Sequence, residues 1–181
     1  MSIKSVSLTQ NYFELFGLPI AFEIDKTELS ANFLALQSAY HPDKFVNSDD
    51  EERRIAVQLT GFVNEALSTL QSTRLRARYL LTLEGIDFDD DRDATTDVNY
   101  LLEQMEIRQS IEDVEQTDDP MGELERLREI ITVRQNGIEQ AFAQDYQQGD
   151  FSAAKESVLK LRYCERIFGE IQRMEDRLDD F

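Results

Sequence analysis

The segment Tyr40-His41-Pro42-Asp43-Lys44-Phe45 combines a restricted backbone with side chains that can make strong polar contacts. Pro42 fixes its own φ angle and restricts His41, so a turn at this point is rigid. A rigid turn presents its side chains at a small cost in conformational entropy when a partner binds. The carboxylate of Asp43 can accept a bidentate pair of hydrogen bonds from an arginine, whereas asparagine would keep the shape and lose the charge. The predicted chemistry is recognition of a cationic group on a partner.

The chain offers few side chains for catalysis or for metal binding. His41 is its only histidine and Cys164 its only cysteine, which is too few for a structural zinc site or an iron-sulfur cluster. There is no Glu-x-x-His pair, no Gly-rich phosphate loop and no Gly-x-Ser-x-Gly motif. We therefore expect no enzyme activity, no cofactor and no bound metal, and we expect Cys164 to be a core or boundary thiol.

The composition indicates a helical chain that avoids nucleic acid and membranes. Its 181 residues allow one compact domain or two small ones, and only 7 Gly and 3 Pro interrupt many helix-forming residues. With 19 Lys and Arg against 37 Asp and Glu, the net charge of −18 has the wrong sign for binding phosphates or anionic lipid. No apolar run of spanning or signal-peptide length is present, so we expect a soluble, cytoplasmic protein.

The charge is spread unevenly, which predicts two domains. Residues 1–85 carry a net charge of −3 and residues 86–181 a net charge of −15. Between the halves runs Asp87-Phe88-Asp89-Asp90-Asp91-Arg92-Asp93, which lacks the spacing of a calcium-binding loop and predicts a solvated linker. We expect domains at 1–85 and 97–181, joined by an acidic linker at 86–96.

In the first domain, the pattern predicts a helical hairpin with short flanking helices. Capping pairs predict helix starts at Asn11 with Glu14, Asp25 with Glu28, and Ser48 with Glu51. Two apolar stripes at helical spacing are Leu29, Phe33, Leu36 and Tyr40, then Ile55, Leu59, Phe62, Ala66 and Leu70. Because Pro42 ends the first of these helices, the two pair antiparallel and the Tyr40–Phe45 segment lies at their tip. Ser72 or Thr73 caps a fourth helix at 74–83, followed by Gly85.

The second domain reads as a three-helix bundle. The first helix is expected to begin near Asp97 and to end near Glu115. The second is expected from Asp119-Pro120 to about Tyr146, and the third follows Gly149 and Asp150 and ends near Leu178. Two core stripes follow heptad-like spacing: Leu124, Leu127, Ile131, Ile138 and Phe142, then Ala154, Val158, Leu161, Phe168, Ile171 and Leu178.

The helix that begins near Asp97 carries two apolar faces. One holds Val98, Leu101, Leu102 and Met105, and the opposite one holds Tyr100, Ile107, Ile111 and Val114. A helix at the edge of a bundle needs only one apolar face for the core. The other face is either covered by the first domain or exposed as a binding patch.

The hairpin with His41-Pro42-Asp43 at its tip resembles the J domain of DnaJ-type co-chaperones. The resemblance includes Tyr40, Lys44, Asn64-Glu65-Ala66, Leu70 and Arg76 to Tyr79. It implies that Tyr40, His41, Pro42, Asp43 and Lys44 bind a DnaK-type chaperone and stimulate its ATP hydrolysis. One departure is that residues 31–40 contain no Lys or Arg, whereas J domains usually carry basic residues on this helix, so electrostatic steering is expected to be weaker.

Longer segments narrow the resemblance to the bacterial HscB family of iron-sulfur cluster co-chaperones, over nearly the whole chain. These segments are Asn11 to Pro19, Tyr40 to Phe45, Arg76 to Leu81, Leu102 to Glu106 and Asp180-Phe181. The resemblance implies a monomer that binds the chaperone HscA through the J domain and the cluster scaffold IscU through the C-terminal bundle. The scaffold-binding residues it implies are Leu101, Leu102, Met105, Glu106, Gln109, Asp113 and Tyr163. Gln109 and Asp113 replace Glu of the family pattern, and Tyr163 replaces Phe.

Apart from an enzyme, which the sequence does not favour, two alternatives to this function stay open at this point. One is a J-domain co-chaperone that serves a different client protein, and the other is a helical adaptor in which His-Pro-Asp occurs by chance. A pulldown that retains a different protein would favour the first, and an Asp43→Asn variant with unchanged partner binding would favour the second.

Overall fold

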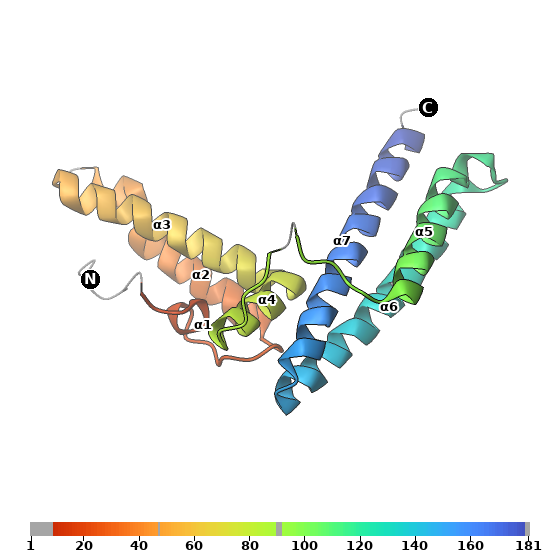
Figure 1. The fold of residues 1–181 in the computed structure, drawn as a ribbon. Coiled ribbons are helices and arrows are strands. Elements are labelled where there is room, and N and C mark those ends of the chain that lie inside the picture. The colour runs from red at the N-terminus through yellow and green to blue at the C-terminus, as the bar shows by residue number, and fades with distance from the viewer. Residues whose placement is uncertain (1–8, 47, 90–91, 180–181) are drawn as a thin grey trace. The chain divides into compact units, whose positions relative to one another are not determined.

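Helices make up the regular secondary structure of the part of the chain that the computed structural model describes, residues 9–46, 48–89 and 92–179, and these residues contain no strand. The all-helical fold predicted from composition is therefore confirmed. The chain divides into two compact units, residues 1–80 and 81–181. The elements (Figure 1) are α1 (Tyr12–Leu15), α2 (Lys26–Tyr40), the 3₁₀ helix η2 (Pro42–Phe45), α3 (Asp50–Gln71), α4 (Thr73–Leu83), α5 (Val98–Glu112), the 3₁₀ helix η3 (Val114–Gln116), α6 (Pro120–Gln148) and α7 (Phe151–Asp179).

Side-chain caps begin α1 and α2 where the sequence predicts them. Asn11 Oδ1 accepts the backbone N–H of Glu14 at 2.9 Å, and the Asn11 N–H donates to the Glu14 carboxylate at 3.2 Å, which forms a complete capping box. Asp25 accepts the backbone N–H groups of Thr27 at 2.8 Å and of Glu28 at 3.2 Å. Each cap satisfies backbone donors that the first turn of a helix leaves unpaired.

Helix α3 begins one residue later than predicted. Its cap is Asp49, whose carboxylate accepts the backbone N–H of Glu52 at 2.8 Å, and Ser48 does not fill this role. Both residues precede an acidic side chain by three positions, so the sequence pattern does not separate them. The charge of Asp49 interacts more favourably with the positive end of the helix dipole than a serine hydroxyl does.

The α2–α3 hairpin forms the core of the first unit, and the two helices lie side by side (Figure 1). The buried face of α3 is turned slightly from the predicted stripe. Ile55 and Phe62 are half-buried at its edge. The buried side chains of the two helices are Leu29, Tyr40, Ala56, Leu59, Val63, Ala66 and Leu70.

A buried arginine ties three segments of the first unit together. Arg76 is only 4% exposed; its Nε donates to the Phe22 carbonyl at 2.7 Å and its Nη1 donates to the Leu70 carbonyl. Its guanidinium also lies over the Phe22 ring, 5.4 Å from the centroid. Because a buried charge without partners is costly, these contacts fix the start of α4 against the end of α3 and the segment before α2.

Helices α5, α6 and α7 form the predicted three-helix bundle. Asp97 and Asp119 cap α5 and α6, each accepting a backbone N–H three residues ahead, at 3.1 Å and 3.0 Å. Pro120 occupies the first turn of α6, and Gly149 ends that helix with a φ of 76° in the left-handed region, which glycine adopts without strain.

Helix α5 is shorter than predicted. It ends at Glu112 instead of near Glu115, and the 3₁₀ turn η3 follows it. This tighter turn places Val114 in the core with no exposed surface. The apolar side chain therefore contributes to packing as predicted, although it lies outside the α-helix.

The core of the bundle is mainly apolar. Its main cluster holds Ile107, Ile111, Val114, Leu124, Leu127, Ile131, Cys164, Ile167, Ile171 and Met174, with Ile138, Phe168 and Leu178 packed against it. The three helices also bury the polar residues Gln104, Ser157 and Arg162. Gln104 is 2% exposed, and its side-chain oxygen and nitrogen find no hydrogen-bond partner among the described residues. Cys164 is fully buried, as expected, and burial raises the pKa of its thiol.

The described residues of the acidic segment before α5 lie against α7. The Asp93 carboxylate pairs with Lys155 Nζ at 3.0 Å and that of Asp97 with Lys160 Nζ at 2.7 Å, and these hydrogen bonds lower the pKa of both carboxyl groups. Phe88 is buried, and Lys155 Nζ lies 5.0 Å from its ring centroid. These residues are more closely held than the solvated loop that the sequence predicted. The predictions at Asp90, Asp91, Asp180 and Phe181 lie outside the described residues.

Candidate functional site

The tip of the α2–α3 hairpin is a single rigid turn. His41 adopts an extended backbone with φ −57° and ψ 129°, as expected for a residue before proline. Pro42 then begins η2, and the backbone N–H of Asp43 donates to His41 Nδ1 at 3.3 Å. The imidazole therefore caps the short helix that carries Asp43 and Lys44.

The polar side chains of the tip point into solvent. The side chain of Asp43 is 85% exposed and that of His41 is 50% exposed, with His41 Nδ1 3.6 Å from Asp43 Oδ2. The backbone hydrogen bond and this ion-pair contact use the same nitrogen of His41. The exposed carboxylate of Asp43 stays open to a partner.

Tyr40 has a different place from the other four residues predicted to bind the chaperone. It is 7% exposed, and its carbonyl accepts a hydrogen bond from Thr60 Oγ1 at 3.3 Å across the hairpin. Tyr40 thus lies beneath the tip, and its part in chaperone binding stays a prediction.

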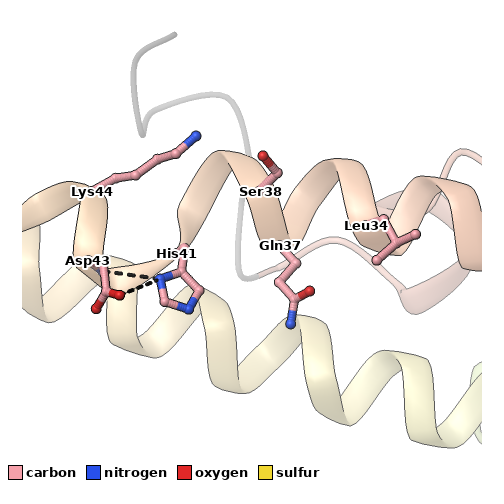
Figure 2. Close-up of a pocket in the computed structure, with 6 residues that line it drawn as sticks. All are labelled: Leu34, Gln37, Ser38, His41, Asp43 and Lys44. Atoms are coloured by element: carbon pink, nitrogen blue, oxygen red, sulfur yellow. Dashed lines mark hydrogen bonds and ion pairs between the residues drawn. The ribbon is translucent and has the colours of Figure 1, made fainter.

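A shallow pocket extends the tip along α2. It is lined by Leu34, Gln37, Ser38, His41, Asp43 and Lys44. Figure 2 shows Leu34, Gln37 and His41 following one another along α2 towards the turn. The three lining residues that precede His41 were not predicted from the sequence. Their spacing of seven, four and three residues before it, which places them on one helix face, is the signal that could have found them.

The outer face of α5, meaning Leu102, Met105 and Glu106, is exposed. Leu102 is 53% exposed and Met105 is 66% exposed, and Glu106 beside them is also exposed. Leu101 is half-buried at the edge of this face. On the opposite side of the helix Tyr100, Ile107 and Ile111 are buried, so the two apolar faces predicted from the sequence have different environments.

Three more residues predicted to bind the scaffold lie at the end of α5 and on α7. Gln109 Nε2 donates to Asp113 Oδ2 at 3.0 Å, which joins them at the end of α5. Tyr163 lies on α7, half-buried, with its ring edge-on to that of Tyr100 at 6.0 Å between centroids. Tyr100 is held in turn by a hydrogen bond to the Lys160 carbonyl at 2.8 Å, and burial raises the pKa of its hydroxyl.

Across residues 9–46, 48–89 and 92–179, no three His, Cys, Asp or Glu side chains come together in a way that could hold a metal ion. The same ranges contain no helix with the length and apolar character needed to cross a membrane. The described residues thus include an exposed polar turn at the tip of the hairpin and an exposed, largely apolar face on α5.

Comparison with known proteins assigns the chain to a family. The family model described as the HscB C-terminal oligomerisation domain matches residues 96–172. A co-chaperone protein HscB homolog from Vibrio cholerae is 38% identical over 168 residues, which cover 93% of this chain and 98% of that protein. One from Shewanella loihica is 36% identical over 171 residues, covering 93% of this chain and 99% of that protein.

Solved structures agree with these relatives. The chaperone HscB from Vibrio cholerae matches with a TM-score of 0.86 at 37% identity, covering 93% of this chain and 99% of that one. The human co-chaperone protein HscB matches with the same TM-score of 0.86 at 27% identity, covering 94% and 84%. The α2–α3 hairpin with its flanking helices is thus the predicted J domain, and α5–α7 form the C-terminal bundle. The chain belongs to the HscB family of J-domain co-chaperones.

Proposed function

We propose that the chain stimulates ATP hydrolysis by a DnaK-type chaperone, HscA, through the tip formed by His41, Pro42, Asp43 and Lys44. The observation that carries this proposal is the 85% exposed carboxylate of Asp43 on a turn fixed by Pro42 and by the His41 cap. A charged carboxylate that needs little ordering is well suited to a bidentate contact with a chaperone arginine. The hydrolysis itself is carried out by the chaperone.

The second part of the proposal is that the C-terminal bundle binds the iron-sulfur cluster scaffold IscU and brings it to the chaperone for cluster transfer. Leu102 and Met105 supply exposed apolar area, which is the main source of affinity in protein interfaces. Glu106 and the Gln109–Asp113 pair form an acidic flank that orients the partner. Tyr163 on α7 and the half-buried Leu101 are the other residues proposed to contact the scaffold.

This proposal keeps the domain division at 1–85, 86–96 and 97–181, a monomeric chain and a cytoplasmic location. In this proposal the domain at 1–85 makes the chaperone contact and the domain at 97–181 makes the scaffold contact. The resemblance of the chain to the bacterial family supports these assignments.

The experiment that tests both parts measures steady-state ATPase activity of HscA with this protein and IscU, each alone and together. We expect synergistic stimulation from the pair. Asp43→Asn abolishes all stimulation, because it removes the charge that contacts the chaperone. The double variant Leu102→Ala/Met105→Ala removes only the synergy. Ile130→Ala/Val133→Ala is the matched control, since it trims two exposed apolar side chains on α6.

Two results would contradict the proposal in different ways. If IscU adds nothing while Asp43→Asn still abolishes stimulation, the chain is a J-domain co-chaperone for a different client protein. If Asp43→Asn leaves stimulation unchanged, the tip is not the chaperone contact.

A further inference from the structure

We propose that a pocket between α5 and α7, here called the arginine pocket, binds a carboxylate-bearing segment of the scaffold protein, with Arg108 and Arg173 as its donors. This inference rests on the proposed function, because it extends the scaffold contact from the outer face of α5 to α7. It adds a contact of opposite charge to the acidic flank, so the scaffold would meet an acidic side and a basic side of the same surface.

The arginine pocket lies between the C-terminal halves of α5 and α7. Three arginines line it, Arg108 from α5 and Arg173 and Arg177 from α7, together with the acids Glu112 and Glu170. Three arginines against two glutamates make the pocket locally positive, although residues 86–181 carry a net charge of −15. A local field of this sign attracts an anionic group and repels a cationic one.

Two guanidinium groups of the pocket have donors to offer. Arg173 is exposed and has no hydrogen bond or ion pair among the described residues. Its Nη1 lies 3.4 Å from the point where a β-carbon would sit on Gly169, so the missing side chain there lets the guanidinium lie close to α7. Arg108 Nε donates to Glu170 at 3.2 Å, which leaves its two Nη nitrogens for a further acceptor. A carboxylate between two such groups receives charge-assisted hydrogen bonds from both.

The arginine pocket continues the surface proposed to bind the scaffold. On α5, Arg108 follows Met105 by three residues, a spacing that makes two side chains neighbours on a helix. On α7, Glu170 follows Tyr163 by seven residues, which is two turns along the same side of the helix. A scaffold that covers Met105 and Tyr163 therefore reaches the pocket within one or two turns along both helices.

The floor of the arginine pocket suits the stem of an acidic side chain. Ile111 and Met174 line the pocket and are 4% and 8% exposed. The methylene groups of an aspartate or glutamate can cover the exposed remainder of these two side chains while the carboxylate reaches the arginines.

One acid of the pocket opposes this binding and makes the inference testable by sign. Glu170 is paired with Arg108, whereas Glu112 is exposed and has no ion pair among the described residues. Removing the charge of Glu112 should strengthen the binding of a carboxylate, because like charges repel. The same substitution should weaken the binding of a cationic group.

The experiment is a calorimetric titration of IscU into the full chain at about 50 mM and about 300 mM KCl, which spans weak and strong screening. We expect Arg173→Gln to raise the dissociation constant about 5-fold at low salt and less than about 2-fold at high salt. We expect Glu112→Gln to lower it about 2-fold at low salt. Arg54→Gln removes the same charge from an exposed position on α3, so it is the matched control and should leave the constant unchanged.

Three outcomes would overturn the inference and leave the proposed function intact, provided that Leu102→Ala/Met105→Ala still weakens IscU binding. The first is an Arg173→Gln titration that matches that of Arg54→Gln. The second is weaker binding by Glu112→Gln, which indicates a cationic group of the scaffold at the pocket. The third is a dimer in sedimentation experiments that Arg173→Gln dissociates, which assigns the pocket to an acidic segment of a second copy of this chain. IscU binding that Leu102→Ala/Met105→Ala leaves unchanged overturns the proposed scaffold contact and this inference together.

Discussion

The tip of the hairpin and the outer face of α5 are both exposed, but they are built in different ways. The tip owes its shape to covalent restriction at Pro42 and to a short-range hydrogen bond from the Asp43 N–H to His41. The outer face of α5 is regular helix, and its position depends on the packing of the opposite face, where Tyr100 and Ile107 are buried. Local chemistry therefore sets one surface, and tertiary packing sets the other.

The two surfaces therefore differ in how strongly partner binding depends on the stability of the fold. At the tip, a side chain can be changed without touching the core, so a substitution there can alter partner binding and leave the free energy of unfolding unchanged. At α5, the same helix supplies the patch on one side and core residues on the other. Mutations on the buried side should therefore disturb a surface that they do not reach.

The largest expected effect is a loss of chaperone stimulation at the tip with no loss of fold stability. Asp43→Asn should lower chaperone stimulation by about 100-fold or more, since a charged hydrogen-bonded partner is worth several kcal/mol at an interface. Its free energy of unfolding should stay within about 0.5 kcal/mol of the parent, because surface substitutions away from special features have small effects. ATPase assays and thermal unfolding check the two values. Glu51→Gln, which neutralises an exposed acid on α3, is the control. An equally large loss of stimulation with this variant would show that the effect is not specific to Asp43.

The buried side of α5 offers the opposite case. Ile107→Ala should lower the free energy of unfolding by about 2–4 kcal/mol, because it opens a cavity in the core of the bundle. It should also weaken scaffold binding, although Ile107 is only 9% exposed. Urea unfolding and calorimetric titration with IscU measure the two effects. Scaffold binding that is unchanged despite the lost stability would show that the patch does not depend on core packing.

The outer side of α5 should show binding loss alone. Leu102→Ala/Met105→Ala should weaken IscU binding by about 30-fold, as expected when two apolar anchors each contribute about 1 kcal/mol. Stability should hardly change, since both side chains are exposed. Direct titration calorimetry measures the affinity, and the Ile130→Ala/Val133→Ala protein shows what trimming a different apolar patch does.

A substitution at Gln104 should stabilise the packing of α5 in the bundle. Gln104→Leu should raise the free energy of unfolding by about 1–2 kcal/mol, since it replaces buried polar atoms that have no partner among the described residues. Circular dichroism during urea unfolding gives the value. Gln144→Leu, at an exposed position of α6, should have no comparable effect. A destabilised Gln104→Leu protein would show that the amide makes a contact with water that matters.

The smallest effect concerns pH. The pKa values of Asp93 and Asp97 lie below the ordinary value of 3.8 because Lys155 and Lys160 stabilise the charged carboxylates in the folded state. This stabilisation is complete above pH 3.8 and is lost as the pH falls from there through the lowered pKa values. The urea midpoint of the chain should therefore fall less between pH 5 and pH 3 in Asp93→Asn than in the parent. Asp118→Asn, an exposed acid before α6, should keep the parent's full pH dependence.

Short-range features of the fold were predictable from the sequence. Asn11, Asp25 and Asp119 cap their helices as predicted, because a cap depends on residues within one turn. The start of α3 was missed by one residue because Ser48 and Asp49 offer similar caps. The tip was predictable because its rigidity comes from Pro42 itself.

Features that depend on tertiary packing were not predictable. Both faces of α5 are apolar, so periodicity identified two faces but did not say which one packs into the bundle. Contacts with α7, such as the hydrogen bond from Tyr100 to the Lys160 carbonyl, settle the orientation in the structure. Leu34 was missed for a related reason, since one exposed leucine off the core stripe resembles an ordinary surface residue until its neighbours in space are known.

The burial of Cys164 has a practical consequence for labelling. The chain has no other cysteine, and this thiol is buried with a raised pKa, so it forms little of the reactive thiolate. A cysteine introduced at an exposed position beside each surface, as in Val46→Cys near the tip or Val98→Cys at the start of α5, would react first with a maleimide dye. Each surface can therefore carry a single fluorophore with its proposed contact residues unchanged, and fluorescence can report separately when the tip and the outer face of α5 are occupied.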